Sequence, residues 1–95
     1  MPYIVAERRA LYDEHLSALA HAIDENTPGG DINYIVTSIL AEWIEKRGLS
    51  YAALAEATGV VETAKLELYR RIAAPYEDGK IAENGDAYRH LGGAD

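Results

Sequence analysis

Seven apolar residues in the middle of the chain repeat with the period of an α-helix, and no other feature restricts the fold so strongly. They are Ile32, Ile35, Val36, Ile39, Leu40, Trp43 and Ile44. Steps of three and four residues place all seven on one side of a helix, which gives that helix a broad apolar face. Asp31 is suited to cap its first turn, and Gly48 is a typical residue just beyond its last. The pattern predicts a helix over residues 31–47 at the centre of the core.

Three further helices are predicted on either side of this one. The first covers residues 6–25. A short third helix begins after the capping residue Ser50 and ends at Gly59. A fourth helix covers residues 62–74 and ends at Pro75, which lacks the backbone donor that a helix interior needs. Apolar residues lie on two sides of this fourth helix, which indicates contacts on both.

The residues after the fourth helix contain two turn sequences, Asp78–Gly79 and Asn84–Gly85. They predict a C-terminal arm with short helical turns only, at residues 80–84 and 87–91, and fraying at residues 92–95. No segment shows the pattern of a β-strand. The predicted fold is all-α: a small bundle of four main helices with an extended C-terminal arm, forming a single domain over residues 1–95.

Length and composition restrict the classes of protein that remain open. A chain of 95 residues buries only about 60–65% of its unfolded surface, so a partner subunit would add much to its core, and we expect a homodimer or homotetramer. The absence of cysteine removes disulfides, thiolate nucleophiles and zinc–cysteine sites. A net charge of −7 disfavours binding to duplex DNA or to anionic membranes. With no signal peptide and no long apolar run, the expected location is the bacterial cytoplasm.

The end of the predicted fourth helix and the arm after it carry side chains suited to a small anionic ligand. Cations hold phosphate, tyrosine rings stack on bases, and amide or carboxylate oxygens hydrogen-bond to base edges. The candidate ligand-binding residues are Lys65, Tyr69, Arg70, Tyr76, Asn84 and Asp86. A second interpretation stays open, in which Arg70 and Arg71 form ordinary ion pairs with nearby carboxylates and attach the arm to the helix.

Residues 51–68 partly match a helix-turn-helix, the first alternative. Small or apolar residues occupy several of the expected positions, and Gly59 falls at the turn between the two helices. Lys65 departs from the pattern because it occupies a position that should be buried. With the acidic balance of the chain, this makes a DNA-binding regulator the weaker interpretation.

Two pairs of carboxylates suggest a second alternative, a Mg²⁺-dependent nucleotide pyrophosphatase. Glu42 and Glu45 lie one helical turn apart, as do Glu83 and Asp86, so each pair has the spacing to bind a cation through oxygen atoms. The same spacing is common on any solvated helix face. We therefore expect no catalytic activity, no metal and no cofactor.

Three sequence strings resemble a family of short, mostly uncharacterised helical proteins encoded by phages and bacteria. The strings are GDINY at residues 30–34, KLELYRR at 65–71 and PYEDGKIAENGD at 75–86, and the third is the most specific. The resemblance spans nearly the whole chain. Small oligomeric phage proteins of this size include sponges that sequester cyclic-nucleotide immune signals, and analogy of fold and size implies the same for this chain.

These observations lead to one expected function and two rivals. The expected function is non-catalytic binding of a small anionic ligand, with cyclic dinucleotides as the class that a phage sponge would sequester from host immunity. A cyclic dinucleotide would lie across a subunit interface because its symmetry matches that of a dimer. The rivals are a helix-turn-helix regulator and a structural or protein-interaction oligomer.

Overall fold

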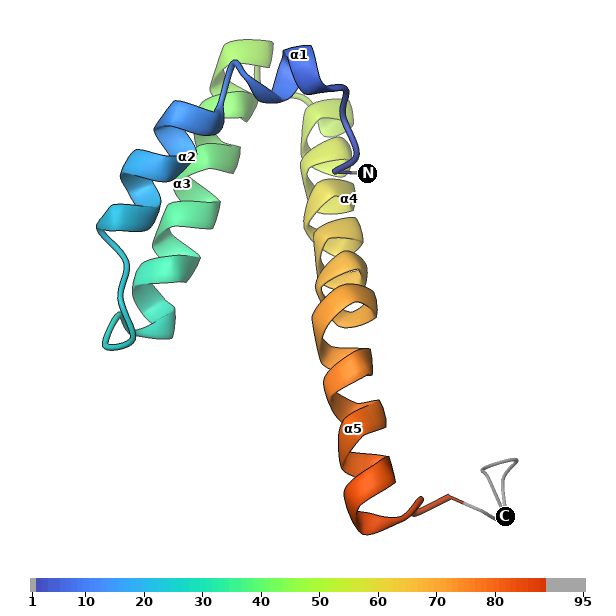
Figure 1. Ribbon diagram of the computed structural model, residues 1–95. Helices are drawn as coiled ribbons and strands as arrows, with labels where there is room; N and C mark the ends of the chain where they lie inside the picture. The colour runs from blue at the N-terminus through green and yellow to red at the C-terminus, as the bar shows by residue number, and fades with distance from the viewer. Residues whose placement is uncertain (1, 89–95) are drawn as a thin grey trace. The chain divides into compact units, whose positions relative to one another are not determined.

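The computed structural model describes residues 2–88 and confirms the all-α class (Figure 1). Its elements are α1 (Ala6–Arg9), α2 (Asp13–His21), α3 (Gly29–Arg47), α4 (Tyr51–Leu68), the π-helical segment η1 (Tyr69–Ala73) and α5 (Ala74–Asn84). No strand occurs in the described part of the chain. The chain divides into two compact units, residues 1–60 and 61–95, and the single domain stays a prediction. Over residues 2–88 no helix has the length and apolarity needed to cross a bilayer.

Helix α3 is the helix predicted from the seven apolar residues. It begins two residues earlier than expected, after Pro28, so Asp31 lies inside the first turn and not at the capping position. Its carboxylate there still faces the positive end of the helix dipole. The predicted C-terminal end is confirmed: Gly48 adopts a φ of 92°, and its N–H donates to the carbonyl of Glu45 at 3.2 Å.

The predicted first helix is divided in two. Helix α1 ends at Arg9, and bonds of the i→i−3 type tighten the chain as far as Tyr12. Helix α2 then begins at Asp13 and ends at His21, four residues before the predicted end at residue 25. Acidic residues in the first turn of α2 favour this new start. The chain then reverses between α2 and α3 (Figure 1) through a loop in which Asp24 and Thr27 hydrogen-bond to each other and to the backbone.

The third and fourth predicted helices are one helix. Ser50 caps its start as predicted, because its Oγ accepts the N–H of Ala53 at 3.1 Å. The predicted break at Gly59 is wrong: Gly59 lies within α4, and helical structure continues from Tyr51 to Asn84 (Figure 1). Long helices tolerate a glycine at a cost of about 1 kcal/mol when the flanking residues favour helix.

The predicted end of the helix at Pro75 is also wrong, and η1 explains why. Over Tyr69–Ala73 the hydrogen bonds change to the wider π type, and the α-helix starts again at Ala74. Pro75 therefore falls in the first turn of α5, where its missing N–H costs no hydrogen bond. The segment expected to be an arm is helical to Asn84. The turn predicted at Asp78–Gly79 is wrong, because both residues lie inside α5.

The turn predicted at Asn84–Gly85 is confirmed. Gly85 adopts a φ of 86°, which favours glycine, and its N–H donates to the carbonyl of Ile81 at 2.8 Å. The chain leaves the helix there. The turn predicted over residues 87–91 falls largely outside the described residues, and the fraying predicted for 92–95 lies wholly outside them.

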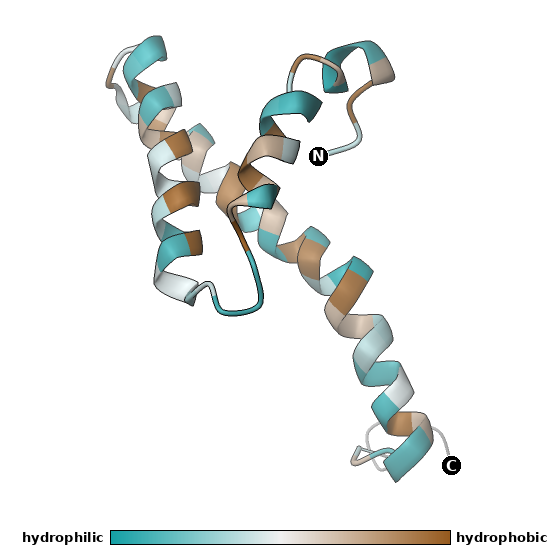
Figure 2. Ribbon diagram, turned by 60° about the vertical axis from the view of Figure 1, so that its left-hand side comes forward, coloured by the Kyte–Doolittle hydropathy of each residue, from teal (hydrophilic) through white to brown (hydrophobic). Residues whose placement is uncertain are grey.

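A single chain buries very little apolar surface. Among residues 2–88, the buried side chains are Ala53 and Ala57, which are 3% and 6% exposed. The apolar face of α3, expected to be the centre of the core, holds no buried residue, and Ile39 is 57% exposed. Apolar residues also recur along the whole of the α4–α5 helix (Figure 2). The apolar spacing that normally forms a core is present in these helices. Most of the apolar residues in that pattern are nevertheless not covered by other side chains.

Substitutions of two glycines test the helix boundaries. No heavy atom lies within 4 Å of a Cβ added at Gly59, so Gly59→Ala should raise the free energy of unfolding by about 0.5–1 kcal/mol through helix propensity. Gly48→Ala is the matched control, because its positive φ should make it destabilising by about 1 kcal/mol or more. Urea denaturation followed by circular dichroism measures both. A destabilised Gly59→Ala variant would contradict a continuous α4.

Candidate ligand site

Three of the predicted ligand residues lie along one helix. Lys65 is in α4, while Tyr69 and Arg70 begin η1. The Nζ of Lys65 lies 3.5 Å from a Glu62 carboxylate oxygen, and Nη1 of Arg70 lies 3.9 Å from one of Glu67. Both cationic side chains are 69% exposed. Such exposed ion pairs contribute little to stability and leave the cations accessible.

Tyr69 is coupled to a carboxylate two turns further along the helix. Its hydroxyl donates a hydrogen bond to Glu77, and this bond, followed by the charge of Glu77, raises the pKa of Tyr69 above 10.0. Partial burial and the charge of Asp78 add to the rise in the pKa. Each cause favours the neutral phenol over the phenolate. This hydrogen bond therefore connects η1 to α5. It also holds the negative charge of Glu77 next to the predicted anion site.

Tyr76 lies on the first turns of α5 beside a cation that the sequence reasoning did not select. The Nζ of Lys80 lies 5.6 Å from the centroid of the Tyr76 ring, which is within the range of a cation–π contact. Lys80 Nζ also lies 3.3 Å from a Glu83 carboxylate oxygen. The ring of Tyr76 is mostly exposed, so one face already holds a cation while much of the side chain remains open to solvent.

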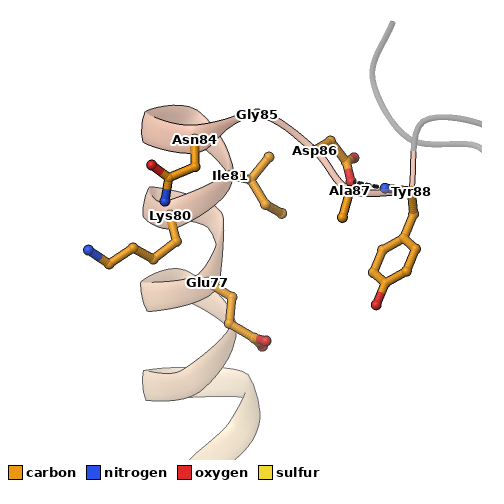
Figure 3. A pocket seen from close by; sticks show the side chains of 8 residues that line it. All are labelled: Glu77, Lys80, Ile81, Asn84, Gly85, Asp86, Ala87 and Tyr88. Atoms are coloured by element: carbon orange, nitrogen blue, oxygen red, sulfur yellow. Dashed lines mark hydrogen bonds between the residues drawn. The ribbon is translucent and has the colours of Figure 1, made fainter.

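The last two predicted residues, Asn84 and Asp86, line one recess of about 290 Å³ at the end of α5. Its other residues are Glu77, Lys80, Ile81, Gly85, Ala87 and Tyr88. Asp86 Oδ1 accepts the N–H of Tyr88 at 2.8 Å and fixes the turn that closes one side. In Figure 3 the side chain of Ile81 points toward this turn, while those of Lys80 and Asn84 point away from it.

The structure therefore divides the predicted set. Asn84 and Asp86 share a recess, and the remaining four residues lie along the helix outside it. Two carboxylates and one lysine line the recess, so it is a poor site for an anion. Sequence reasoning missed Glu77 and Lys80, although their spacing to Asn84 by steps of three and four would have revealed a shared face had α5 been predicted as a helix.

The α2–α3 region holds a second recess of about 540 Å³, lined by Tyr12, Ser38, Ile39, Glu42, Trp43 and Lys46. The guanidinium of Arg47 lies 5.1 Å from the centroid of the Trp43 ring and also pairs with Glu56 at 2.6 Å. These two contacts of Arg47 hold the end of α3 against α4. The recess is lined mainly by apolar surface, and its charged residues are Glu42 and Lys46.

The structure bears directly on the two alternative motifs. Helix α4 runs through Gly59 without a turn, so residues 51–68 do not form the two helices of a helix-turn-helix. Within residues 2–88, no group of three or more histidine, aspartate or glutamate side chains is placed to hold a metal ion. The pairs Glu42–Glu45 and Glu83–Asp86 therefore remain isolated pairs in this part of the chain.

A family model described as a domain of unknown function, DUF6899, matches residues 1–87. This agrees with the resemblance expected over nearly the whole chain and assigns no activity. No curated protein and no solved structure matches the chain.

The titration of Tyr69 tests the contact with Glu77. Glu77→Ala should lower the pKa of Tyr69 toward 10.0, because it removes both the hydrogen bond and the charge that favour the phenol. Asp78→Ala, the matched control, should lower the pKa less. Nuclear magnetic resonance of the Tyr69 ring against pH measures the shift, and an unchanged pKa in Glu77→Ala would contradict the contact.

The raised pKa also sets the direction of a pH effect on stability. A group with a higher pKa in the folded state stabilises the fold at pH values below its unfolded pKa of 10.0. That contribution is lost as the pH rises through the folded value. Glu77→Ala should therefore reduce the loss of stability in strongly alkaline solution.

Proposed function

The chain belongs to the DUF6899 family, whose description assigns no activity, and we propose from its own residues that it is a non-catalytic binding protein that works as a homo-oligomer. The oligomer is a dimer or a tetramer in which apolar faces left open by one chain are covered by another. This combines the expected binding function with the rival interpretation of an interaction oligomer.

The small buried core carries this proposal. Large apolar side chains stand exposed on helices throughout the chain, including Leu16, Ile39, Leu66 and Ile72, the last two at 62% and 64%. Burial of apolar surface supplies about 25 cal/mol per Å² toward folding, and two buried alanines supply only a small part of what a chain of this length needs. Association with further copies of the same chain covers such faces without a second kind of protein.

A small anionic ligand is the second part of the proposal, and the local helix geometry favours it. Tyr69 and Arg70, chosen from the sequence for a base and a phosphate, both fall in η1. Single π-helical turns within longer helices occur often at functional sites because they change the direction of side chains. Lys65 lies one turn earlier. Cyclic dinucleotides remain the class to test, and a phage sponge acting in the bacterial cytoplasm remains the corresponding role.

The oligomer is tested by mass and by unfolding. Analytical ultracentrifugation should show a species with the mass of two or four chains. The thermal midpoint should rise with protein concentration, because assembly stabilises the folded state by mass action. A monomer that unfolds cooperatively at a midpoint independent of concentration would overturn the proposal.

Ligand binding is tested separately by calorimetry with a panel of cyclic dinucleotides. The wild-type chain should release or absorb heat with at least one member, and Lys65→Ala and Arg70→Ala should each weaken binding by about tenfold, as expected for lost charged hydrogen bonds. Arg9→Ala in α1 is the matched control for loss of one positive charge. An absence of heat with every member would remove the ligand and leave the oligomer.

A further inference from the structure

We infer that the recess of the α2–α3 region binds a guanine base, at a site separate from the anion site proposed on η1. The recess has a volume of about 540 Å³, and its lining lies wholly within residues 1–60. It combines two aromatic rings and an aliphatic side chain with one hydroxyl, one carboxylate and one ammonium group. The residues are Tyr12, Ser38, Ile39, Glu42, Trp43 and Lys46.

The residues that α3 contributes form two adjacent rows along the helix. Ser38, Glu42 and Lys46 follow one another in steps of four and make a polar row. Ile39 and Trp43, also four apart, make an apolar row one residue further round. Helix α3 is regular from Gly29 to Arg47, so residues four apart are neighbours on one side of it. A flat ligand can therefore contact the apolar row with its face and the polar row with its edge.

The ring of Trp43 is held in place for stacking. The guanidinium of Arg47 lies 5.1 Å from the centroid of this ring, and Arg47 Nη1 lies 2.6 Å from a carboxylate oxygen of Glu56. Arg47 does not line the recess, so the recess contains a part of the indole that this cation leaves open. Nucleobases stack on such aromatic side chains. A bound base would also cover Ile39, which is 57% exposed in one chain.

The polar row supplies both kinds of hydrogen-bonding group that a guanine edge needs. Glu42 only accepts hydrogen bonds when ionised, and Lys46 only donates them. Neither forms an ion pair with another side chain among residues 2–88, and both are exposed. Guanine carries two adjacent donors, N1–H and the 2-amino group, next to the acceptor O6. Glu42 can accept from both donors while Lys46 donates to O6.

The same groups select against other ligands. One carboxylate and one ammonium group give the lining no net charge, so an uncharged ligand meets less repulsion there than an anion does. Adenine has one donor group on the corresponding edge, so the carboxylate accepts one hydrogen bond from it and not two. Guanine is therefore the base that uses Glu42 most fully.

The fluorescence of Trp43, the one tryptophan of the chain, reports whether the recess is occupied. Guanosine, which is uncharged, should quench this fluorescence along a saturable curve, because the base stacks on the indole. Inosine lacks the 2-amino group, and adenosine lacks both that group and N1–H. Each should bind about tenfold more weakly, as expected for the loss of a hydrogen bond to a charged group. Equal affinities for the three nucleosides would overturn the assignment to guanine.

Two pairs of variants test the polar row. Glu42→Gln should weaken guanosine binding by about tenfold, because it removes the charge and one of the two acceptor oxygens. Glu45→Gln is the matched control: it removes the same charge from the same helix outside the recess and should leave binding unchanged. Lys46→Met should also weaken binding by about tenfold, whereas Lys80→Met in α5 should not. Circular dichroism verifies that each variant remains helical.

The outcomes separate this inference from the proposed function. Guanosine binding that is weakened by Glu42→Gln and Lys46→Met, but not by Arg70→Ala, supports the recess. If Arg70→Ala abolishes the response and Glu42→Gln does not, the base binds at η1 and the recess is overturned as its site. Absence of quenching by guanosine in the wild-type chain overturns the inference and leaves the homo-oligomer and its anion site standing.

Discussion

The shortage of buried apolar surface within one chain is the constraint on which the rest of this structure depends. Ala53 and Ala57 are the buried side chains among the described residues, and alanine gains little from leaving water. The helical periodicity of α3 nevertheless supplies a broad apolar face of the kind that normally forms a core. These uncovered apolar faces are the physical basis of the proposed association between copies.

The helix continues across Pro75, and this continuity decides which residues belong to one helical element. Had the helix ended at Ala74, residues 66 and 81 would belong to different elements. The π-helical turns of η1 bring Pro75 into the first turn of a new α-helical stretch, where a proline is compatible with helix. As a result, Leu66 and Ile81 belong to one continuous helix. The π-helical turns also rotate the side chains after η1 relative to those before it, so a local change in hydrogen bonding sets which side chains share a face.

The sequence predicted the parts of the fold that depend on strong local patterns. Helix α3 and the ends at Gly48 and Gly85 follow from apolar spacing and from glycine at positive φ. The errors occurred where one residue was taken to decide an element. Gly59 and Pro75 both lower helix propensity, but helix formation is cooperative, so favourable neighbours carried the helix through them. Those two errors also determined what was missed at the site.

With α5 read as an arm, the contact between Tyr69 and Glu77 could not be foreseen. A hydroxyl and a carboxylate two turns apart meet only when the intervening residues are helical. The recess at Asn84 and Asp86 was predicted only in part for the same reason. The turn at its end was predicted from the sequence, but the helix that carries Lys80 and leads into the turn was not. Chemistry that depends on a long-range helical register is invisible until that register is known.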